Sequence, residues 1–461
     1  MNLFTNNPIL KVDSYKTSHY KQYPPNTTEV SSYVEARKGD EVVFFGLQGF
    51  LKGLRPVTMA DVSEAERIFK AHGVPFNRDG WVDIIAKNGG KLPLEIQAIP
   101  EGTVVPGGTV MVQVRNTLGS AFWLPSYIET TMLRSVWYPS TVATNSRRVK
   151  KIILEFLKKT ADSPKDEIDF KLHDFGARGV SSGESAALGG AAHLVNFKGT
   201  DTIEAIPYIF AAYNTTEMPG FSIPAAEHST ATAWGKDAEG DFYSHMLKAY
   251  PNSPIIAVVS DTYDIYNACK NLWGGLLKEK VERLGNDGRM LVIRPDSGNP
   301  VDVVMQVLRI LFDRFGYKNN KKGYKVLPKF LRIIQGDGVN EESITEILTA
   351  MEKEKFSASN ITFGMGGALL QKCDRDTYSF AQKACEVVKA GKSYEIFKQP
   401  FTDSGKASKK GRQAVVLRNK VPTTVPEKQA KTGNILKTVW KNGEFLIEHT
   451  FEEVRERAAV K

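Results

Sequence analysis

Short apolar runs alternate with glycine-containing polar loops in the second half of the chain, most clearly between residues 291 and 367. Three of these runs are strand-like, and each is followed by a loop with at least one glycine: 291–293, 330–334 and 361–363. The two intervening segments carry apolar residues at three- and four-residue spacing, which predicts helices. Asn299 followed by Pro300 begins the first helix, and Asn340 begins the second. The predicted order is strand, helix, strand, helix, strand.

Strands joined by crossover helices run parallel, because only antiparallel neighbours can be linked by tight turns. Parallel sheets bind ligands at the carboxyl ends of their strands, and all three glycine loops fall there. Glycine lets backbone N–H groups approach a ligand closely, and repeated glycines before a helix favour an anion such as phosphate. The carboxylates of Asp296 and Asp337 in these loops suit hydroxyl groups or a metal ion. Together these features predict a site for a ribose phosphate.

The same alternation extends over residues 168–372 and indicates the fold class. A helix of small residues at 181–194 is expected to pack closely on a sheet, and a buried-type strand at 255–259 leads into Asp261. An irregular α/β barrel of parallel strands would bring every ligand-type loop to one mouth. We therefore predict an α/β barrel-like domain over residues 166–385, with a boundary near the polar break at 162–165.

Both ends of the chain, residues 1–165 and 386–461, predict a second, α+β domain, in which the β-rich C-terminal segment packs with the N-terminal one. The two-residue Asn442-Gly443 turn predicts a hairpin, and Thr450 with Glu453 forms a capping box for a last helix. The other expected elements are a strand at 30–35, a helix at 58–73, a β-rich stretch at 92–114, helices at 126–138 and 141–159 separated by Pro139, and a helix through Glu386.

Composition narrows the class of protein. The 461 residues are 41% hydrophobic and 25% charged, no apolar run is long enough for a membrane helix, and the N-terminus lacks signal-peptide character, so we expect a cytoplasmic protein without a membrane partner. Three cysteines at spacings that fit no zinc pattern indicate buried thiols. The net charge of +9 is compatible with binding to nucleic acid, but Lys and Arg are scattered along the chain, which favours small anionic substrates over nucleic acid.

His228 lies between an acid and a predicted helix start, on the expected ligand mouth. A lone histidine is more often structural than catalytic, but this position favours a functional role. The other histidines offer no metal-ligand spacing. The Walker phosphate loop is absent, Gly364-x-Gly366 lacks the third glycine of a dinucleotide fingerprint, and the loop at Asp261 has one acid where the common diphosphoribosyl transferases have two.

Long irregular strings carry a resemblance from one end of the chain to the other: residues 13–16, 20–26, 173–176, 196–202, 224–230, 294–300, 335–338 and 369–372. In these strings the chain resembles the nicotinamide phosphoribosyltransferase family of type II phosphoribosyltransferases. The resemblance implies transfer of the phosphoribosyl group of 5-phosphoribosyl 1-diphosphate to nicotinamide, giving nicotinamide mononucleotide and diphosphate in NAD biosynthesis. It also implies Mg²⁺ bound through the diphosphate with no protein ligand assigned, and a homodimer with shared active sites. ATP would be a coupled co-substrate, hydrolysed through a phosphohistidine at His228.

For the base, the resemblance implies a slot between Phe175 and Tyr15 of the partner subunit, with Arg178 and Arg294 at the ring and diphosphate. Asp201 would accept a hydrogen bond from the carboxamide. Nicotinate would instead bring a carboxylate against that carboxylate, a mismatch of several kcal/mol in a dry site. Asp201 therefore favours the amide over the acid.

For the phosphoribosyl group, the resemblance implies ribose contacts from Asp296, Gly336 and Asp337. The remaining implied contacts are Gly366 and Gly367 at the 5′-phosphate, Arg375 and Lys383 reaching across the dimer, and Arg37, Lys398 and Asp261 on the diphosphate and ATP side. Carboxylates near the ribose would offset the positive charge of an oxocarbenium-like transition state.

The chain also departs from the family pattern. Met365, Ala368 and Ala381 stand where the family often has serine, glycine and serine, which affects the 5′-phosphate geometry. The stretch 37–43 is shorter than in animal members, which indicates a bacterial or phage version. Two alternatives stay open: nicotinate phosphoribosyltransferase, against which Asp201 argues, and a non-catalytic nucleotide-binding protein, for which a phosphorylatable His228 would be unnecessary.

Overall fold

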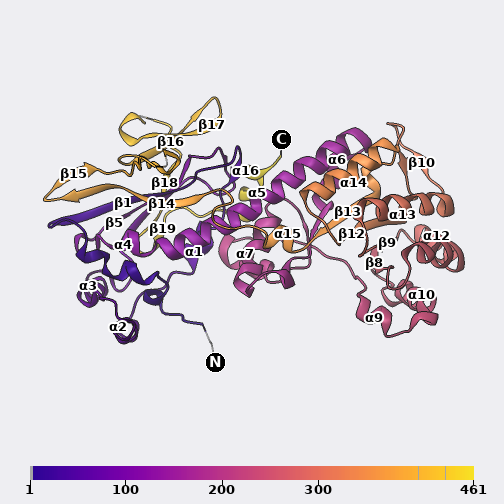
Figure 1. Ribbon diagram of the computed structural model, residues 1–461, viewed down its shortest axis with the longest axis horizontal. Coiled ribbons are helices and arrows are strands. Elements are labelled where there is room, and N and C mark those ends of the chain that lie inside the picture. Colours follow the sequence, from indigo (N-terminus) through magenta and orange to yellow (C-terminus); the bar gives the residue numbers. More distant parts are fainter. Residues whose placement is uncertain (1–3, 403, 431, 461) are drawn as a thin grey trace. The chain divides into compact units, whose positions relative to one another are not determined.

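The computed structural model describes residues 4–402, 404–430 and 432–460, and the chain divides into two compact units (Figure 1). Unit 1 comprises Met1–Thr144, Tyr208–Thr216 and Cys373–Ala459, and unit 2 comprises Asn145–Pro207, Glu217–Lys372 and Val460–Lys461. These bounds differ from the domain limits expected at 165 and 385, because one long helix runs through residue 144 and because residues 380–389 pair with an N-terminal strand.

Unit 2 is built on a six-stranded sheet with the order β7-β6-β13-β12-β9-β8, in which every pair is parallel. Its strands are β6 (Leu172–Asp174), β7 (Gly199–Thr200), β8 (Ile255–Val259), β9 (Met290–Arg294), β12 (Leu331–Gln335) and β13 (Ile361–Met365). The three strands expected in the second half of the chain are therefore confirmed, in parallel register. Their central residues are buried, as expected for a sheet covered on both faces.

The two edges of this sheet are bridged by one irregular segment, residues 221–225. Phe221 pairs with Gly199 in edge strand β7, and Ala225 pairs with Ala257 in the opposite edge strand β8, both in parallel orientation. The backbone N–H of Phe221 donates to Lys198 at 2.8 Å, and that of Ala257 donates to Pro224 at 2.9 Å. The sheet thus curls into the irregular barrel-like fold that the sequence predicts.

Helices flank these strands, as Figure 1 shows for α10, α12, α13 and α14. Asn299 caps α13 (Pro300–Phe315), and Asn340 forms a capping box with Ser343 for α14 (Glu341–Lys353), so both expected helix starts are confirmed. The other helices of unit 2 are α6 (Pro164–Glu167), α7 (Gly183–Leu194), α9 (His228–Thr232), α10 (Glu239–Ala249), α11 (Ile265–Asn267), a π-helix (Ala268–Leu276), α12 (Lys278–Asn286) and α15 (Gly367–Leu370).

Unit 1 contains a seven-stranded sheet with the order β15-β14-β1-β5-β3-β18-β19, in which all pairs are antiparallel. Its strands are β1 (Thr27–Ala36), β3 (Leu94–Ala98), β5 (Val110–Asn116), β14 (Phe380–Lys389), β15 (Lys392–Glu395), β18 (Lys437–Lys441) and β19 (Glu444–Phe445). The shorter pairs are β2 (Val42–Val43) with β4 (Val104–Val105), and β16 (Gln413–Arg418) with β17 (Val421–Pro426); β10 (Lys318–Asn319) with β11 (Lys325–Val326) belongs to unit 2.

Several details of unit 1 confirm the sequence analysis. Asn442 and Gly443 both have positive φ, as a two-residue hairpin turn requires. Thr58 with Asp61 and Thr450 with Glu453 form capping boxes for α2 (Met59–His72) and α16 (Phe451–Ala458). The remaining helices here are α1 (Leu47–Lys52), α3 (Arg78–Asn88), α4 (Leu124–Tyr127) and α8 (Ala205–Tyr213), whose last residues belong to unit 1.

Two local predictions were wrong. The helices expected on either side of Pro139 are one helix, α5 (Glu129–Thr160), in which the proline is interior. A proline removes one backbone hydrogen bond of a helix but need not end a helix that contacts with other segments stabilise. Here the Ser140 hydroxyl accepts a hydrogen bond from the Phe45 backbone N–H and donates one to the Phe45 carbonyl. The helix expected up to Glu386 is strand β14, because pairing with β1 outweighs the helical propensity of its Ala, Gln, Lys and Glu residues.

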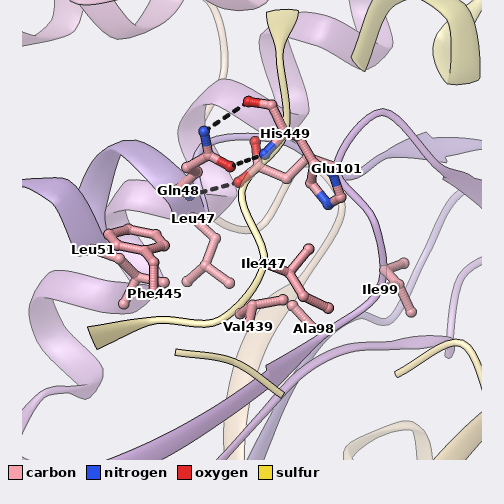
Figure 2. A pocket seen from close by; sticks show the side chains of 10 residues that line it. All are labelled: Leu47, Gln48, Leu51, Ala98, Ile99, Glu101, Val439, Phe445, Ile447 and His449. Carbon is pink, nitrogen blue, oxygen red and sulfur yellow. Dashed lines mark hydrogen bonds between the residues drawn. The ribbon is translucent and has the colours of Figure 1, made fainter. Parts of the chain in front are cut away.

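A buried polar centre connects the three segments of unit 1, and Figure 2 shows its members Gln48, Glu101 and His449. Glu101 is fully buried and accepts hydrogen bonds from the backbone of Gln48 at 2.6 Å and from the hydroxyl of Tyr213 at 2.6 Å. The Gln48 side-chain amide donates to the carbonyls of Ala212 and His449, and its oxygen accepts from the His449 backbone. These hydrogen bonds replace those that the polar groups would make to water, so the burial of this centre costs little free energy.

Candidate active site

The predicted site residues of unit 2 follow the carboxyl ends of its parallel strands. They are Phe175 and Arg178 after β6, Asp201 after β7, Asp261 after β8, Arg294 and Asp296 at the end of β9, Gly336 and Asp337 after β12, and Gly366 and Gly367 after β13. Parallel strands end on the same edge, so the sheet brings these loops to one rim. His228 follows the bridging segment 221–225 on the same side.

The Phe175 ring lies against two glycines of the sheet. A Cβ on Gly364 would come within 1.9 Å of the ring, so the absence of a side chain there creates the space for it, whereas one on Gly336 would lie 3.4 Å away, at ordinary contact distance. The Phe175 backbone N–H donates to Met365 at 3.0 Å, and the Arg294 guanidinium lies 5.2 Å from the ring centroid. An aromatic face with a neighbouring cation is thereby held at the rim.

Asp201 is held as a carboxylate by two side chains. Its Oδ1 accepts from His173 Nε2 at 3.0 Å and from Ser222 Oγ at 2.5 Å. Burial acts to raise the pKa of Asp201, but the His173 hydrogen bond and charge, the Ser222 hydroxyl and the Arg294 charge outweigh it, so this pKa lies below its ordinary value. The side chain is 44% exposed. An ionised acceptor therefore faces solvent next to His173, whose ring centroid lies 5.3 Å from that of Phe175.

His228 and Asp261 form a second pair. His228 Nε2 lies 2.9 Å from Asp261 Oδ1, while Asp261 Oδ2 accepts from the Asp296 backbone at 3.0 Å and the Ser297 hydroxyl at 2.5 Å. The Asp261 side chain is only 4% exposed and the His228 ring is 43% exposed. A carboxylate only accepts hydrogen bonds, so Nε2 carries the hydrogen and the neutral ring keeps a lone pair on Nδ1. Nδ1 is then a nucleophile oriented by a buried acid.

Arg294 and Asp296 face each other across a bidentate ion pair, with Arg294 Nη2 at 2.9 and 2.8 Å from the two carboxylate oxygens. His228 Nδ1 lies 3.9 Å from Asp296 Oδ2, so the pair adjoins the histidine. A Cβ added to Gly336 would meet Asp296 Oδ1 at 3.0 Å. The geometry places both charges of this pair within reach of a ligand that lies over Gly336.

The glycine loop after β13 leaves open space. Gly366 caps the four-residue helix α15, and a Cβ on Gly367 would meet no atom within 4 Å. The loop that carries Arg178 approaches this turn, because a Cβ on Gly179 would lie 3.3 Å from Gly367. Arg178 itself is exposed, as is Asp337. An anion at this turn would meet backbone donors and an arginine loop.

The other five predicted residues lie in unit 1, where four of them form a cationic group. Burial lowers the pKa of Lys383 from its ordinary value, and the charges of Arg37, Lys398 and Arg375 lower it further, while Glu129 opposes them. Arg37 Nε and Nη2 are buried without a hydrogen-bond partner among the described residues, and Nε forms only an ion pair with Glu35 Oε1 at 3.6 Å. Buried donors without partners are costly, which fits an anionic ligand such as a diphosphate. Tyr15 is 61% exposed, and the Lys16 ammonium lies 5.3 Å from its ring centroid.

Three residues that contribute to these sites had no role in the sequence analysis: His173, Ser222 and Ser297. A signal existed for His173, because it begins the string 173–176, one of those that carry the family resemblance. Ser222 gives no such signal, since its contact with Asp201 depends on how segment 221–225 crosses the sheet edges. Among the described residues, no three His, Cys, Asp or Glu side chains are arranged to hold a metal ion, and no helix is long and apolar enough to cross a membrane.

Comparison of the sequence with known proteins finds relatives over its whole length. The chain is 50% identical to the nicotinamide phosphoribosyltransferase of Xanthomonas campestris pv. campestris, covering 99% of this chain and 98% of the relative. It is 32% identical to that of Acinetobacter baylyi, with the same coverage. Among solved structures, the nicotinate-nucleotide pyrophosphorylase from Pyrococcus furiosus covers 99% of this chain and 97% of its own, with a TM-score of 0.64 at 18% identity.

Human nicotinic acid phosphoribosyltransferase has the same fold, with a TM-score of 0.56 at 16% identity over 97% of this chain and 92% of its own. A sequence model of the nicotinate phosphoribosyltransferase (NAPRTase) family matches residues 170–444, and one of the nicotinamide phosphoribosyltransferase N-terminal domain matches residues 7–96. The resemblance found in the sequence is thereby confirmed. The chain belongs to the nicotinate phosphoribosyltransferase family, with an N-terminal domain of the nicotinamide phosphoribosyltransferase type.

Proposed function

We propose that this chain is a nicotinamide phosphoribosyltransferase of NAD biosynthesis. It transfers the phosphoribosyl group of 5-phosphoribosyl 1-diphosphate to the ring nitrogen of nicotinamide and releases diphosphate. The observation that carries the proposal is Asp201, an ionised carboxylate at the barrel mouth that is bonded to His173, whose ring lies next to that of Phe175. A carboxamide N–H₂ donates to it, whereas the carboxylate of nicotinate is repelled. The full-length similarity to nicotinamide phosphoribosyltransferases supports the same base.

The proposed site offers negative charge to the ribose and positive charge to the diphosphate leaving group. Asp296 and Asp337 lie on the loops after β9 and β12 and would stabilise positive charge that develops on the ribose ring. The turn at Gly366 and Gly367 would hold the 5′-phosphate through backbone donors. Mg²⁺, bound through the diphosphate, would supply charge neutralisation for the leaving group.

ATP hydrolysis is coupled to phosphoribosyl transfer through His228. With Nε2 donating to Asp261, Nδ1 attacks the γ-phosphorus of ATP, a P–N bond forms and ADP leaves. The phosphohistidine brings nearly two negative charges next to Asp296 and is later hydrolysed to histidine and phosphate. The added charge would draw Mg²⁺ and the Arg294 guanidinium toward the diphosphate side of the site.

The site is completed by a second copy of the chain in a homodimer. The cationic group of Arg37, Arg375, Lys383 and Lys398 belongs to unit 1, and so does the exposed Tyr15 ring. The partner's unit 1 would bring these residues to the diphosphate and to the open face of the nicotinamide ring. Because its substrates are intracellular metabolites, we place the enzyme in the cytoplasm.

The test is formation of nicotinamide mononucleotide from nicotinamide and phosphoribosyl diphosphate with Mg²⁺, with and without ATP. Wild type should turn over nicotinamide, ATP should stimulate the reaction, and His228→Ala should abolish only the stimulation. Turnover of nicotinate but not of nicotinamide would assign the sister activity. No turnover of either base would favour a non-catalytic nucleotide-binding protein with this fold.

A further inference from the structure

Two donors converge on a single oxygen of Asp201. His173 Nε2 and Ser222 Oγ both bind Oδ1, at 3.0 and 2.5 Å, and among the described residues none donates to Oδ2. The donors come from different elements: His173 lies in strand β6, and Ser222 lies in the segment that bridges the sheet edges. The carboxylate is thereby fixed from two sides, with its second oxygen left for a ligand.

The His173 ring has little freedom to leave this position. It pairs in register with Gly199 of strand β7, where a Cβ would lie 2.5 Å from His173 Nδ1. Its other neighbour is the Phe175 ring, with centroids 5.3 Å apart. The carbonyl of Gly199 is itself fixed by buried His193, whose Nε2 lies 3.1 Å away. The orientation of His173 is therefore set by strand pairing, independently of any bound substrate.

We propose that His173 and Ser222 are positioning residues that determine the preference for nicotinamide over nicotinate, by occupying Oδ1 of Asp201 and presenting a charged Oδ2 to the carboxamide. The inference rests on the proposed function, because it concerns how Asp201 selects the base. Loss of either donor lets the Asp201 carboxylate rotate and eases its protonation. A protonated or displaced acid binds the amide less well and repels the acid substrate less.

The test compares kcat/KM for nicotinamide and for nicotinate in wild type, His173→Leu, His173→Gln and Ser222→Ala. Loss of a hydrogen bond to a charged acceptor should reduce the nicotinamide-to-nicotinate ratio roughly 10-fold in His173→Leu and in Ser222→Ala. The reduction should come from a higher KM for nicotinamide, with KM for phosphoribosyl diphosphate unchanged. His173→Gln keeps an N–H donor at similar reach and should restore most of the ratio.

Matched controls are His72→Leu and Ser63→Ala, both at exposed positions of helix α2, which should leave the ratio unchanged. Ser222 is exposed, so Ser222→Ala is expected to fold even if His173→Leu does not. A selective wild type whose ratio is unaffected by Ser222→Ala and His173→Leu, but lost in Asp201→Ala, would overturn this inference alone. A wild type that does not use nicotinamide would overturn the proposed function, and this inference with it.

Discussion

Gly364→Ala tests whether the Phe175 ring stacks on the nicotinamide ring. The new Cβ would lie 1.9, 2.3 and 2.8 Å from three atoms of that ring. The nearest ring carbon must retreat by about 1.6 Å to reach an ordinary carbon–carbon separation of about 3.5 Å. The backbone of Phe175 cannot follow easily, because its N–H is bonded to Met365 in the same strand as Gly364. The ring must therefore turn out of its place.

The expected cost has two parts. Overpacking of this kind lowers the free energy of unfolding by about 1–3 kcal/mol. A displaced ring also loses its stacking on nicotinamide, so KM for nicotinamide should rise roughly 10-fold, since an aromatic pair contributes about 0.5–1.5 kcal/mol beyond its buried area. KM for phosphoribosyl diphosphate should stay near its wild-type value.

Gly367→Ala in the same loop is the matched control. Its Cβ would meet nothing within 4 Å, so the free energy of unfolding should not change. If the Gly366-Gly367 turn holds the 5′-phosphate, this variant should instead raise KM for phosphoribosyl diphosphate and leave nicotinamide binding intact. Steady-state kinetics with each substrate varied in turn, and urea unfolding of both variants, measure the contrast. Equal effects of the two variants on both substrates would refute the assignment of separate base and phosphate contacts.

Three further predictions concern the dimer, the cationic group and a buried histidine. Asp296→Asn and Lys383→Ala should each be inactive alone but recover about a quarter of wild-type activity when co-expressed, since a mixed dimer with shared sites keeps one intact site; no recovery would argue against sharing. Arg37→Gln should weaken diphosphate binding in calorimetry but lower the free energy of unfolding by no more than about 1 kcal/mol, because Nε and Nη2 make no hydrogen bond among the described residues and the ion pair with Glu35 is 3.6 Å long. Burial lowers the pKa of His193 to about 3, so between about pH 6.5 and pH 3 this histidine is protonated in the unfolded chain but not in the folded one. The free energy of unfolding should therefore fall as the pH drops below 6.5, by about 1 kcal/mol per pH unit between pH 6 and 4. His193→Gln should flatten this dependence of the urea midpoint and His72→Gln should not.

Much of unit 2 could be predicted from sequence because its elements are locally specified. Asn299 and Asn340 cap their helices, and the short apolar runs at β9, β12 and β13 are separated by these helices, which favours parallel strands. Once the strands are parallel, the carboxyl-end rule identifies the loops that carry Asp261, Asp296 and Gly366 without knowledge of any contact.

What sequence could not give depends on partners distant in the chain. Strand β14 looks helical by itself and becomes a strand only because it lies between β1 and β15. Pro139 signals a helix end, and only the contacts of Phe45 with Ser140 show why α5 continues. The support of Asp201 by His173 and Ser222 needs the register of β6 with β7 and the path of segment 221–225, neither of which a local pattern encodes.

The hydrogen bonding of buried charges separates structural groups from those that await a ligand. Lys171, fully buried, donates its ammonium to the carbonyls of Ala358, Ser359 and Ile361 at 3.1–3.3 Å and lies 3.2 Å from Glu167. Arg37 is also largely buried. Its Nε forms an ion pair with Glu35 Oε1 at 3.6 Å, but neither Nε nor Nη2 has a hydrogen-bond partner in the part of the chain that is described. A fold that satisfies one buried cation with four acceptors is able to satisfy another, so the missing hydrogen bonds of Arg37 are better explained by a ligand than by poor packing. The missing acceptors of Arg37, in a group with Arg375, Lys383 and Lys398, indicate an anionic ligand, and the diphosphate of the proposed reaction is such an anion.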